Sequence, residues 1–321
     1  MTKAGSRGTA ARSPAASGLV ILDKPSGWTS HDVVARVRHL AGTRRVGHAG
    51  TLDPMATGVL VVGVEKATRL LGHLALTEKQ YTGTIRLGQT TDTDDAEGET
   101  IAEASAAGVS AAALHAAAAA LTGEIQQVPP GFSAIKVAGK RAYRLARGGA
   151  APELAARTVT VRAFVIEAVR PLGDVTDVDV TVICSSGTYI RALARDLGAA
   201  LGVGGHLTAL RRTRVGPYEI GVARTLDQLA ASLGLIPLAE AAAAAFPRRD
   251  LTEDEARLVA HGGRLPAAGS GDAPAAAGPG GPGGQAAPAA GPVAAFGPDG
   301  SLIALLAEHA GEARPLAVFV P

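Results

Sequence analysis

The sequence predicts an α+β protein, in which a domain built on a mostly antiparallel mixed sheet precedes a small β-rich module. Strand-like and helix-like segments follow one another without the regular repeat of βαβ units. The apolar content of 47% over 321 residues is enough for a sizeable core. We expect a disordered tail at 1–17, the larger domain at 18–246 and the smaller module at 247–321, with a low-complexity insertion at 267–292 rich in Ala, Gly and Pro.

The first elements are indicated by apolar runs and capping residues. Residues 18–25 (GLVILDKP) form a short apolar run closed by proline, which predicts a buried strand. A helix should follow, because Thr29 or Ser30 can cap its start and Gly42 can end it. Residues 59–64 (VLVVGV) predict a second buried strand, entered from a glycine-rich loop.

The middle of the chain continues with strands and two helices. Residues 79–88 alternate apolar and polar side chains, which is typical of a half-buried strand. Residues 110–123 combine a serine cap, strong helix formers and a closing glycine. Residues 158–169 and 176–184 predict a strand pair, and Gly187 should open another helix.

The smaller module is expected to begin with a helix and to end with short strands. Residues 251–262 have helical character. After the insertion, the segments VAAF, SLIALLAE and LAVFVP are separated by the turn-like sequences PDG and GEARP.

Charge is distributed unevenly although the net charge is only +2. Residues 92–99 carry five acids, and we expect them to form a loop. Three segments carry basic residues and no acids, namely 36–45, 136–147 and 206–214. Each can bind phosphates of a nucleic acid, and each is equally compatible with an ordinary solvated face.

Several classes of protein lack support in the sequence. No apolar run is long enough to cross a bilayer, and the start of the chain has no apolar signal core. A single cysteine, Cys184, is typical of a reducing compartment, and it reads as a buried apolar residue rather than a nucleophile. Phosphate-loop, dinucleotide and metal motifs are missing from the sequence, so we expect no cofactor and no metal.

The segment GHAGTLDPMATGVL concentrates the groups that can do chemistry. Its loop has several glycines, one carboxylate, Asp53, and one histidine, His48, and it leads into a buried strand. Functional groups are often held on such anchored loops. Both residues also have a structural alternative. An Asp-Pro pair is an ordinary turn signal, and a histidine in a loop without a functional role fits the pattern equally well.

Arg191 and the tyrosines are further candidates. Arg191 falls in the first turn of a helix, where the dipole disfavours a cation, so an anion such as Asp53 is expected nearby. An exposed arginine reaching solvent is the alternative. All four tyrosines lie in or beside these segments, and aromatic rings can stack on bases. Core packing is the alternative for Tyr189 and Tyr218, whereas Tyr143 lies in a basic run.

Six ordered segments carry a family resemblance that spans roughly residues 18–220. The chain resembles the bacterial TruB-type tRNA pseudouridine synthases, which modify the T-loop uridine conventionally numbered 55. The segments are GLVILDKPSGWTSHDVV, RRVGHAGTLDPMATGVLVVGVEKATRL, EKQYTGTIRLGQTTDTDDAEGE, QVPPGFSAIKVAGKRAYRLAR, CSSGTYIRALARDLG and HLTALRRTRVGPY.

The resemblance implies roles for particular residues. It makes Asp53 the catalytic aspartate, Arg191 its ion-pair partner and Tyr81 the ring that stacks on the target base. His48 would meet the RNA, and Tyr189 would line the pocket. The segments that support the site or touch the RNA would include Lys24, Lys136, Arg141 and Tyr143.

The resemblance also implies the activity and the architecture. It implies an isomerase with a pseudouridine synthase-like catalytic domain and a PUA-like C-terminal module, acting on the T-arm loop of tRNA by base flipping. We expect a cytoplasmic monomer without a protein partner. Two alternatives stay open, namely an RNA-binding module without catalysis and a nucleosidase, which would usually need a second carboxylate.

Overall fold

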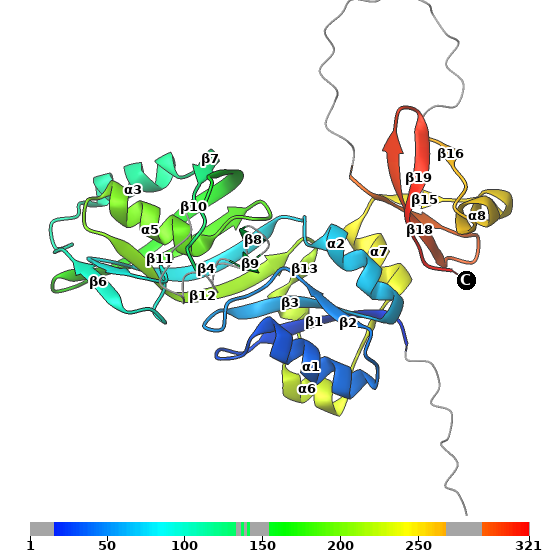
Figure 1. The fold of residues 1–321 in the computed structure, drawn as a ribbon, viewed down its shortest axis with the longest axis horizontal. Coiled ribbons are helices and arrows are strands. Elements are labelled where there is room, and N and C mark those ends of the chain that lie inside the picture. Colours follow the sequence, from blue (N-terminus) through cyan, green and yellow to red (C-terminus); the bar gives the residue numbers. More distant parts are fainter. Residues whose placement is uncertain (1–15, 133–135, 138–139, 142–153, 268–290, 321) are drawn as a thin grey trace, which may run out of the picture.

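The computed structural model describes residues 16–132, 136–137, 140–141, 154–267 and 291–320. Within these residues, a long sheet runs through the larger part of the molecule and a five-stranded sheet lies near the C-terminus (Figure 1). Helices are distributed around both sheets (Figure 1). The expected α+β class is confirmed.

The long sheet is mixed but mostly antiparallel, as the sequence predicts. Its strand order is β14-β1-β3-β12-β4-β11-β10-β7, with β2 paired to β3 and β13 paired to β12. Only β12 and β3 are parallel among these pairs. The strands are β1 (Gly18–Lys24), β2 (Val46–Ala49), β3 (Thr57–Val64), β4 (Lys79–Leu87), β7 (Gly123–Gln127), β10 (Arg157–Leu172), β11 (Val175–Cys184), β12 (Gly205–Val215), β13 (Tyr218–Glu219) and β14 (Ile236–Pro237).

The other elements of the described residues surround this sheet or form the smaller ones. The helices are α1 (Ser30–Ala41), α2 (Leu71–Leu74), α3 (Ala111–Ala120), α5 (Ile190–Ala200), α6 (Leu226–Ala231), α7 (Leu238–Ala245) and α8 (Glu253–Ala260), with 3-10 turns η1 (Glu65–Leu70) and η2 (Ile220–Val222). The short strand pairs are β5 (Gln89–Thr91) with β6 (Thr100–Glu103), and β8 (Lys136–Val137) with β9 (Lys140–Arg141). The C-terminal strands are β15 (Arg248–Asp250), β16 (Leu265–Pro266), β17 (Val293–Phe296), β18 (Leu302–His309) and β19 (Glu312–Val318).

Strands β1 and β3 are buried on both faces, which explains their continuous apolar runs. One face packs on α1 and α6 through residues such as Val20 and Leu60. The opposite face packs on α2 and α7 through Leu19 and Val61. Strand β4 instead alternates, and its apolar side chains pack against α3 and α5.

Helix α1 begins and ends where the sequence predicts. Thr29 is its cap, since its hydroxyl accepts from the Asp32 backbone N–H at 3.1 Å while the Asp32 carboxylate accepts from the Thr29 N–H at 2.9 Å. Gly42 ends the helix with a φ of +65°. The cap orients the chain between β1 and α1, where it approaches the loop that carries Asp53.

The basic segment 206–214 lies within the long sheet, and its arginines have partners inside the protein. It is part of β12, which lies between β3 and β4 in the long sheet. Arg211 pairs with Asp23 at 2.7 Å, Arg214 pairs with Glu78 at 2.8 Å, and Arg212 is 1% exposed. Arg211 and Arg214 are thus paired with carboxylates of other elements and Arg212 is buried, although the Arg211 side chain stays 40% exposed.

Two predicted boundaries need correction. Helix α3 ends at Ala120, and Gly123 begins strand β7 with a φ of +97° instead of closing the helix. Strand β19 begins at Glu312, so the GEARP sequence is mostly strand. The turn lies at Ala310 and Gly311, whose φ angles are +51° and +79°.

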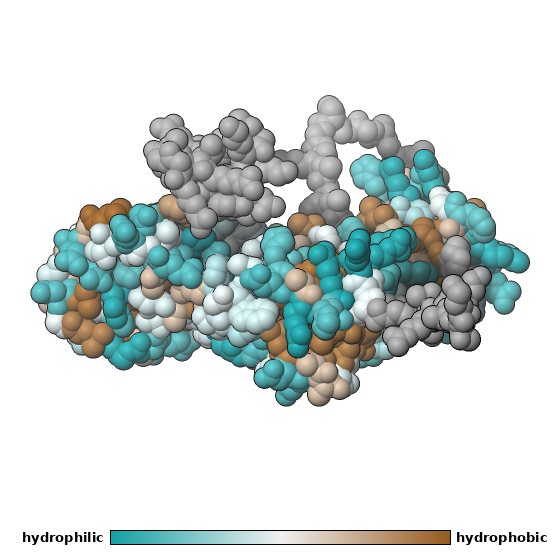
Figure 2. All heavy atoms as spheres, turned by 60° about the horizontal axis from the view of Figure 1, so that its bottom comes forward, coloured by the Kyte–Doolittle hydropathy of each residue, from teal (hydrophilic) through white to brown (hydrophobic). Residues whose placement is uncertain are grey.

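The C-terminal sheet shares a core with the rest of the chain. Phe296, Leu305 and Phe319 belong to the same buried cluster as Leu19 in β1 and Phe246 after α7. A second cluster lies between this sheet and α8. On the face shown in Figure 2, apolar residues are exposed in several separate areas among hydrophilic ones. The described residues contain no helix long and apolar enough to cross a membrane.

Candidate active site

Asp53 lies on a tightly held loop between β2 and β3. The Ser30 hydroxyl accepts from the Leu52 N–H at 2.9 Å and donates to the Leu52 carbonyl at 3.1 Å. The Gly27 N–H donates to the Pro54 carbonyl at 2.8 Å. The residues on both sides of Asp53 are therefore fixed, while its own carboxylate stays 37% exposed. This is the arrangement expected of a group that meets a substrate.

Lys24, at the end of β1, supports the same loop through its side chain. Its side chain has no exposed surface, and its Nζ donates to the carbonyls of Pro25, Trp28 and Pro54 at 2.9, 2.6 and 3.1 Å. Burial lowers the pKa of Lys24 to about 8, although the nearby carboxylate of Asp53 opposes this shift. Lys24 thus ties the end of β1 to the residue that follows Asp53.

Arg191 meets Asp53 as the helix-dipole argument predicts. Its Nε lies 3.0 Å from Asp53 Oδ2, and its Nη1 lies 3.3 Å from Asp95 Oδ2. The Nη1 and Nη2 groups also donate to the carbonyls of Thr93 and Phe132, at 2.9 and 3.0 Å. The side chain is buried, so a solvent-exposed arginine is excluded.

The acidic run at residues 92–99 contributes carboxylates to the surroundings of Arg191. Its prediction as a loop did not indicate this role. Asp95 is buried beside Arg191, and Asp94 pairs with Arg195 one turn further along α5 at 3.2 Å. Burial raises the pKa of Asp94, and the two arginines oppose this shift. The turn between β5 and β6 is thereby fastened to the first turns of α5, which hold Arg191.

Tyr81 lies in the core close to the loop that carries Asp53. It packs in the same buried cluster as Leu52, Ile190 and Leu210. Burial raises the pKa of the Tyr81 phenol, and Arg212 offsets this only in part. The ring is therefore a neutral group close to Asp53, whose charge also contributes to the shift.

Arg212 is a buried cation that the sequence reasoning assigned to a phosphate-binding segment. Its Nε donates to the Val59 carbonyl at 2.7 Å, and its Nη2 donates to the Gly50 carbonyl at 2.9 Å. It therefore joins β12 to β3 and to the start of the Asp53 loop. The sequence does not predict this role, because nothing in it distinguishes Arg212 from the neighbouring Arg211 and Arg214.

His48 lies in β2, five positions before Asp53, and is half-buried. Burial, and to a smaller extent the nearby His31 and Arg212, lower its pKa to about 4. The ring is therefore neutral at physiological pH. Its Nδ1 is buried without a hydrogen-bond partner among the described residues. His31 makes an edge contact with it at 5.8 Å between ring centroids.

Tyr189 caps α5 next to Arg191. Its backbone is held by the Gln127 side chain, which accepts from the Tyr189 N–H at 2.8 Å and donates to the Tyr189 carbonyl at 3.1 Å. Gln127 is buried. The end of β7 therefore fixes the point at which α5 begins, and with it the direction of Arg191.

Other predicted residues lie apart from this cluster or outside the described residues. Lys136 and Arg141 are backbone register partners in the β8–β9 pair. Tyr143 lies outside the described residues. Tyr218 is a core residue whose hydroxyl donates to the Ala241 carbonyl at 2.9 Å. Cys184 is a buried apolar residue as expected, and burial raises its pKa to about 11.

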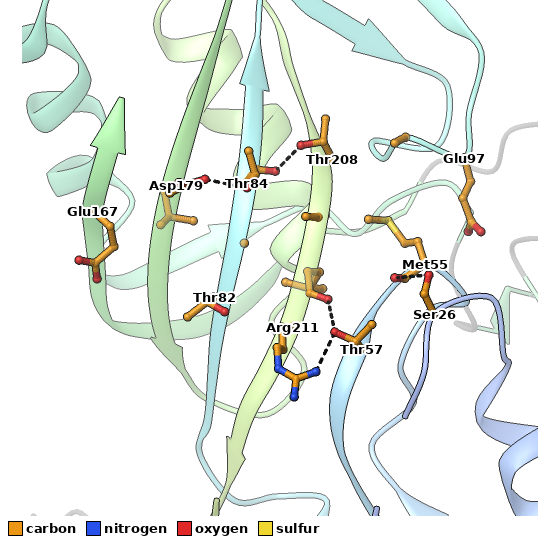
Figure 3. Close-up of a pocket in the computed structure, with 15 residues that line it drawn as sticks. Ser26, Met55, Thr57, Thr82, Thr84, Glu97, Glu167, Asp179, Thr208 and Arg211 are labelled. Carbon is orange, nitrogen blue, oxygen red and sulfur yellow. Dashed lines mark hydrogen bonds between the residues drawn. The ribbon is translucent and has the colours of Figure 1, made fainter. Parts of the chain in front are cut away.

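A cleft of about 620 Å³ adjoins the Asp53 loop, but Asp53 is not among its lining residues (Figure 3). Thr82, Thr84 and Thr208 line it, on the sheet face opposite to α3 and α5. Ser26 and Met55 lie side by side at its edge, where the Ser26 hydroxyl donates to the Met55 carbonyl at 3.3 Å (Figure 3). The exposed carboxylate beside a buried guanidinium makes the Asp53 cluster the stronger candidate for catalysis.

Three family models match the chain in order. Residues 38–190 match the TruB family pseudouridylate synthase N-terminal domain. Residues 191–239 match the tRNA pseudouridylate synthase B C-terminal domain. Residues 285–320 match the tRNA pseudouridine synthase II C-terminal model. The first two matches meet between Ile190 and Arg191, at the start of α5.

Similar proteins and structures extend over nearly the whole chain. The tRNA pseudouridine synthase B of Arthrobacter sp. (strain FB24) is 62% identical over 307 residues, which cover 95% of this chain and 97% of that protein. The protein of the same name from Thermobifida fusca is 60% identical, covering 95% and 99%. A chain in a crystal structure of a Cbf5-Nop10-Gar1 complex is 28% identical with a TM-score of 0.68, covering 95% and 85%. A chain in an H/ACA RNP bound to a substrate RNA containing 2'-deoxyuridine is 25% identical with a TM-score of 0.66, covering 98% and 92%.

Proposed function

The chain belongs to the TruB family of pseudouridylate synthases, and from this we propose that it converts the T-loop uridine at position 55 of tRNA to pseudouridine. The protein is an isomerase, because that reaction rearranges one nucleotide. The relatives named tRNA pseudouridine synthase B support tRNA as the substrate.

The observation that carries the site assignment is the ion pair between Asp53 and Arg191. A carboxylate that is partly exposed while its partner is buried can meet a substrate without losing its counter-ion. Asp53 is thus the proposed catalytic residue. Arg191 is the residue that is proposed to supply its counter-ion, at 3.0 Å between Nε and Oδ2.

The chemistry needs one ionised carboxylate. The reaction breaks the bond between ribose C1′ and uracil N1, turns the base, and joins C1′ to C5, so that nothing is oxidised or hydrolysed overall. Asp53 can act by attacking the nucleotide covalently or by removing a sugar proton while the base departs. Both routes require the charged form of the carboxylate.

The surrounding residues retain the detached base and exclude water. Tyr81 is proposed to stack on the uracil, and the apolar side chains around it leave little room for a hydrolytic water. The target base must first leave its stack, which costs about a few kcal/mol. His48 and Tyr189 are proposed to contact the turned-out nucleotides, and further RNA contacts are proposed for Lys136, Arg141 and Tyr143. Lys24, which has no exposed surface, is proposed to support the Asp53 loop instead.

The C-terminal residues 247–321 are proposed to form a PUA-like module that contributes to RNA binding, next to a catalytic domain at 18–246. We also propose a cytoplasmic monomer. Asp53, Arg191 and Tyr81 come from one copy of the chain, which supports a site that needs no second subunit. Sedimentation of the purified protein at micromolar concentration tests the monomer.

The decisive experiment is incubation with unmodified tRNA, followed by measurement of pseudouridine at position 55. Wild-type protein should form it, and Asp53→Asn should bind tRNA without forming it. Absence of pseudouridine with the wild type, or equal rates for the two proteins, would overturn the proposal. Release of free uracil would instead identify a nucleosidase. Binding by the wild type with no change in the tRNA would identify an RNA-binding module.

A further inference from the structure

The ion pair of the candidate site joins two parts of the chain that are held in different ways. The Asp53 loop is fixed from the side of β1 and α1, through the side chains of Lys24 and Ser30. Arg191 instead is the second residue of α5. Each residue of an α-helix is rotated by about 100° from the one before it, so the direction of the Arg191 side chain depends on where α5 begins.

The start of α5 lacks the usual local signal. Tyr189 stands at the N-cap position with an extended backbone, and its side chain makes no capping hydrogen bond within the part of the chain that the structure describes. Serine, threonine, aspartate and asparagine are the residues that commonly fix this position. Ile190 and Arg191, which follow, are both buried. Another element must therefore fix the start of the helix.

Gln127, the last residue of β7, makes this contact. Its Oε1 accepts from the Tyr189 N–H at 2.8 Å, and its Nε2 donates to the Tyr189 carbonyl at 3.1 Å. The two ends of one amide thus hold both backbone polar groups of the residue that precedes the helix. Gln127 is only 1% exposed, so a backbone group that lost this partner would stay unsatisfied at a cost.

The residues that follow Gln127 contact α5 at two further points. The Val128 carbonyl accepts from Arg195 Nη2 at 2.8 Å. The Phe132 carbonyl accepts from Arg191 Nη2 at 3.0 Å. Both acceptors belong to the main chain, so they stay in place only while the chain after β7 keeps its course. Gln127 attaches this stretch to α5 at the end of the terminal strand of the long sheet.

We propose that Gln127 is a positioning residue for the formation of pseudouridine, because it sets the start of α5 and thereby the place at which Arg191 meets Asp53. This inference rests on the proposed function and deepens it. Gln127 does not touch the reacting atoms and acts through Tyr189 and Arg191. A displacement of about 1 Å in the catalytic geometry can lower a rate about a hundredfold, so a small shift of α5 suffices.

The first test removes the amide and keeps its size. Gln127→Met retains the length of the side chain but has neither the N–H donor nor the carbonyl acceptor. Gln126→Met is the matched control, because Gln126 is the neighbouring residue, is exposed, and donates to the Thr158 hydroxyl at 2.8 Å instead of contacting α5. Pseudouridine formation on unmodified tRNA gives kcat and KM, and thermal unfolding reports the stability of each variant.

Gln127→Met should lower kcat about tenfold to hundredfold and leave KM for tRNA unchanged, whereas Gln126→Met should match the wild type in both constants. A Gln127→Met protein that melts at a lower temperature but reacts at the wild-type rate while folded would overturn the proposal, since Gln127 would then only stabilise the fold. Equal losses of kcat in the two variants would also overturn it, because they would assign the effect to the edge strand as a whole.

Gln127→Glu tests the same contact in a variant whose pattern of donors depends on pH. A protonated carboxyl has one donor and one acceptor, as the amide does, whereas a carboxylate only accepts and cannot bond the Tyr189 carbonyl. An anion beside a helix N-terminus is tolerated, so this variant should fold. The ratio of its kcat to the wild-type kcat should rise as the pH is lowered from about 8 to about 5, toward the ordinary glutamate pKa of about 4.3.

The ratio removes the titration of Asp53, which both proteins share. A Gln127→Glu protein that is as impaired as Gln127→Met at every pH would overturn the proposal, because the restored donor would then make no difference. If the wild type makes no pseudouridine, the proposed function itself has failed. A wild type that makes it beside an equally active Gln127→Met protein shows that only the present inference has failed.

Discussion

The Nε of Arg191 lies 3.0 Å from Oδ2 of Asp53 without a hydrogen bond between them. The guanidinium is held instead by its Nη groups, which contact Thr93, Asp95 and Phe132. Arg191 is therefore fixed independently of Asp53, and the carboxylate can adjust its position while remaining beside a positive charge.

Replacing Arg191 by lysine should separate charge from geometry. Lysine keeps the charge but cannot make the same set of contacts, so kcat should fall about tenfold to hundredfold, equivalent to about 1.5–3 kcal/mol for hydrogen bonds of a charged group. Arg191→Gln should be worse, because it also leaves buried Asp95 unpaired. Single-turnover rates at saturating tRNA measure this, and a lysine variant with wild-type kcat would contradict it.

Gly58 should tolerate no side chain. A Cβ there would lie 2.2 Å from the Arg212 carbonyl oxygen, and the backbone has a φ of +100°. Gly58→Ala should destabilise the protein by more than about 4 kcal/mol, because neither clashing backbone can move without breaking the β3–β12 contact.

Gly72→Ala is the matched control, since nothing lies within 4 Å of its Cβ position and it falls in helix α2. It should be neutral or stabilise by about 0.5–1 kcal/mol. Thermal unfolding of both variants checks the contrast, which equal melting temperatures would refute.

Arg212 should act through the loop rather than on the substrate. Arg212→Lys loses the fork that satisfies the carbonyls of Gly50 and Val59, so the free energy of unfolding should fall by about 3 kcal/mol. Arg211→Lys, one position away, should cost less than about 1 kcal/mol because its pair with Asp23 is partly exposed. Urea denaturation of both variants measures the difference, and equal losses would show that burial of Arg212 is unimportant.

The His48 ring should make stability depend on pH between about 4 and 6.5. Its folded pKa of about 4 lies below the ordinary 6.5, so in this range the unfolded chain binds more protons and stability rises with pH. The full pKa shift corresponds to about 3 kcal/mol in the free energy of unfolding. The observed change should be smaller, because the ring is only half-buried and solvent screens its charge. His48→Asn should flatten this part of the stability curve, whereas an unchanged curve would assign it to other groups.

The sequence indicated the elements that have strong local signals. The cap at Thr29, the apolar runs of β1 and β3 and the alternation of β4 depend on neighbouring residues, and each was confirmed. Strand β12 was missed, because its arginines resemble a solvated basic segment unless their partners Asp23 and Glu78 are known. Those partners lie far away in the sequence.

The candidate site likewise combines residues that have a local sequence signal with residues whose partners are distant in the sequence. Asp53 and Arg191 could be connected because a cation at a helix N-terminus requires a nearby anion. Asp95 could not, since an acidic run is usually solvated, and Lys24 was indicated only by the family resemblance. Their burial is created by the folded chain, which brings distant residues into contact, as with Thr93 and Arg191, which are 98 positions apart.

The core that β1 and α7 share with the C-terminal sheet makes the two parts one cooperative unit. A truncation after Phe246 would remove Phe296 and Phe319 and leave apolar surface of β1 and α7 open to water. We expect such a fragment to aggregate and the whole chain to melt in one calorimetric transition. The orientation of the C-terminal sheet relative to Asp53 is therefore set at folding, before any RNA is bound.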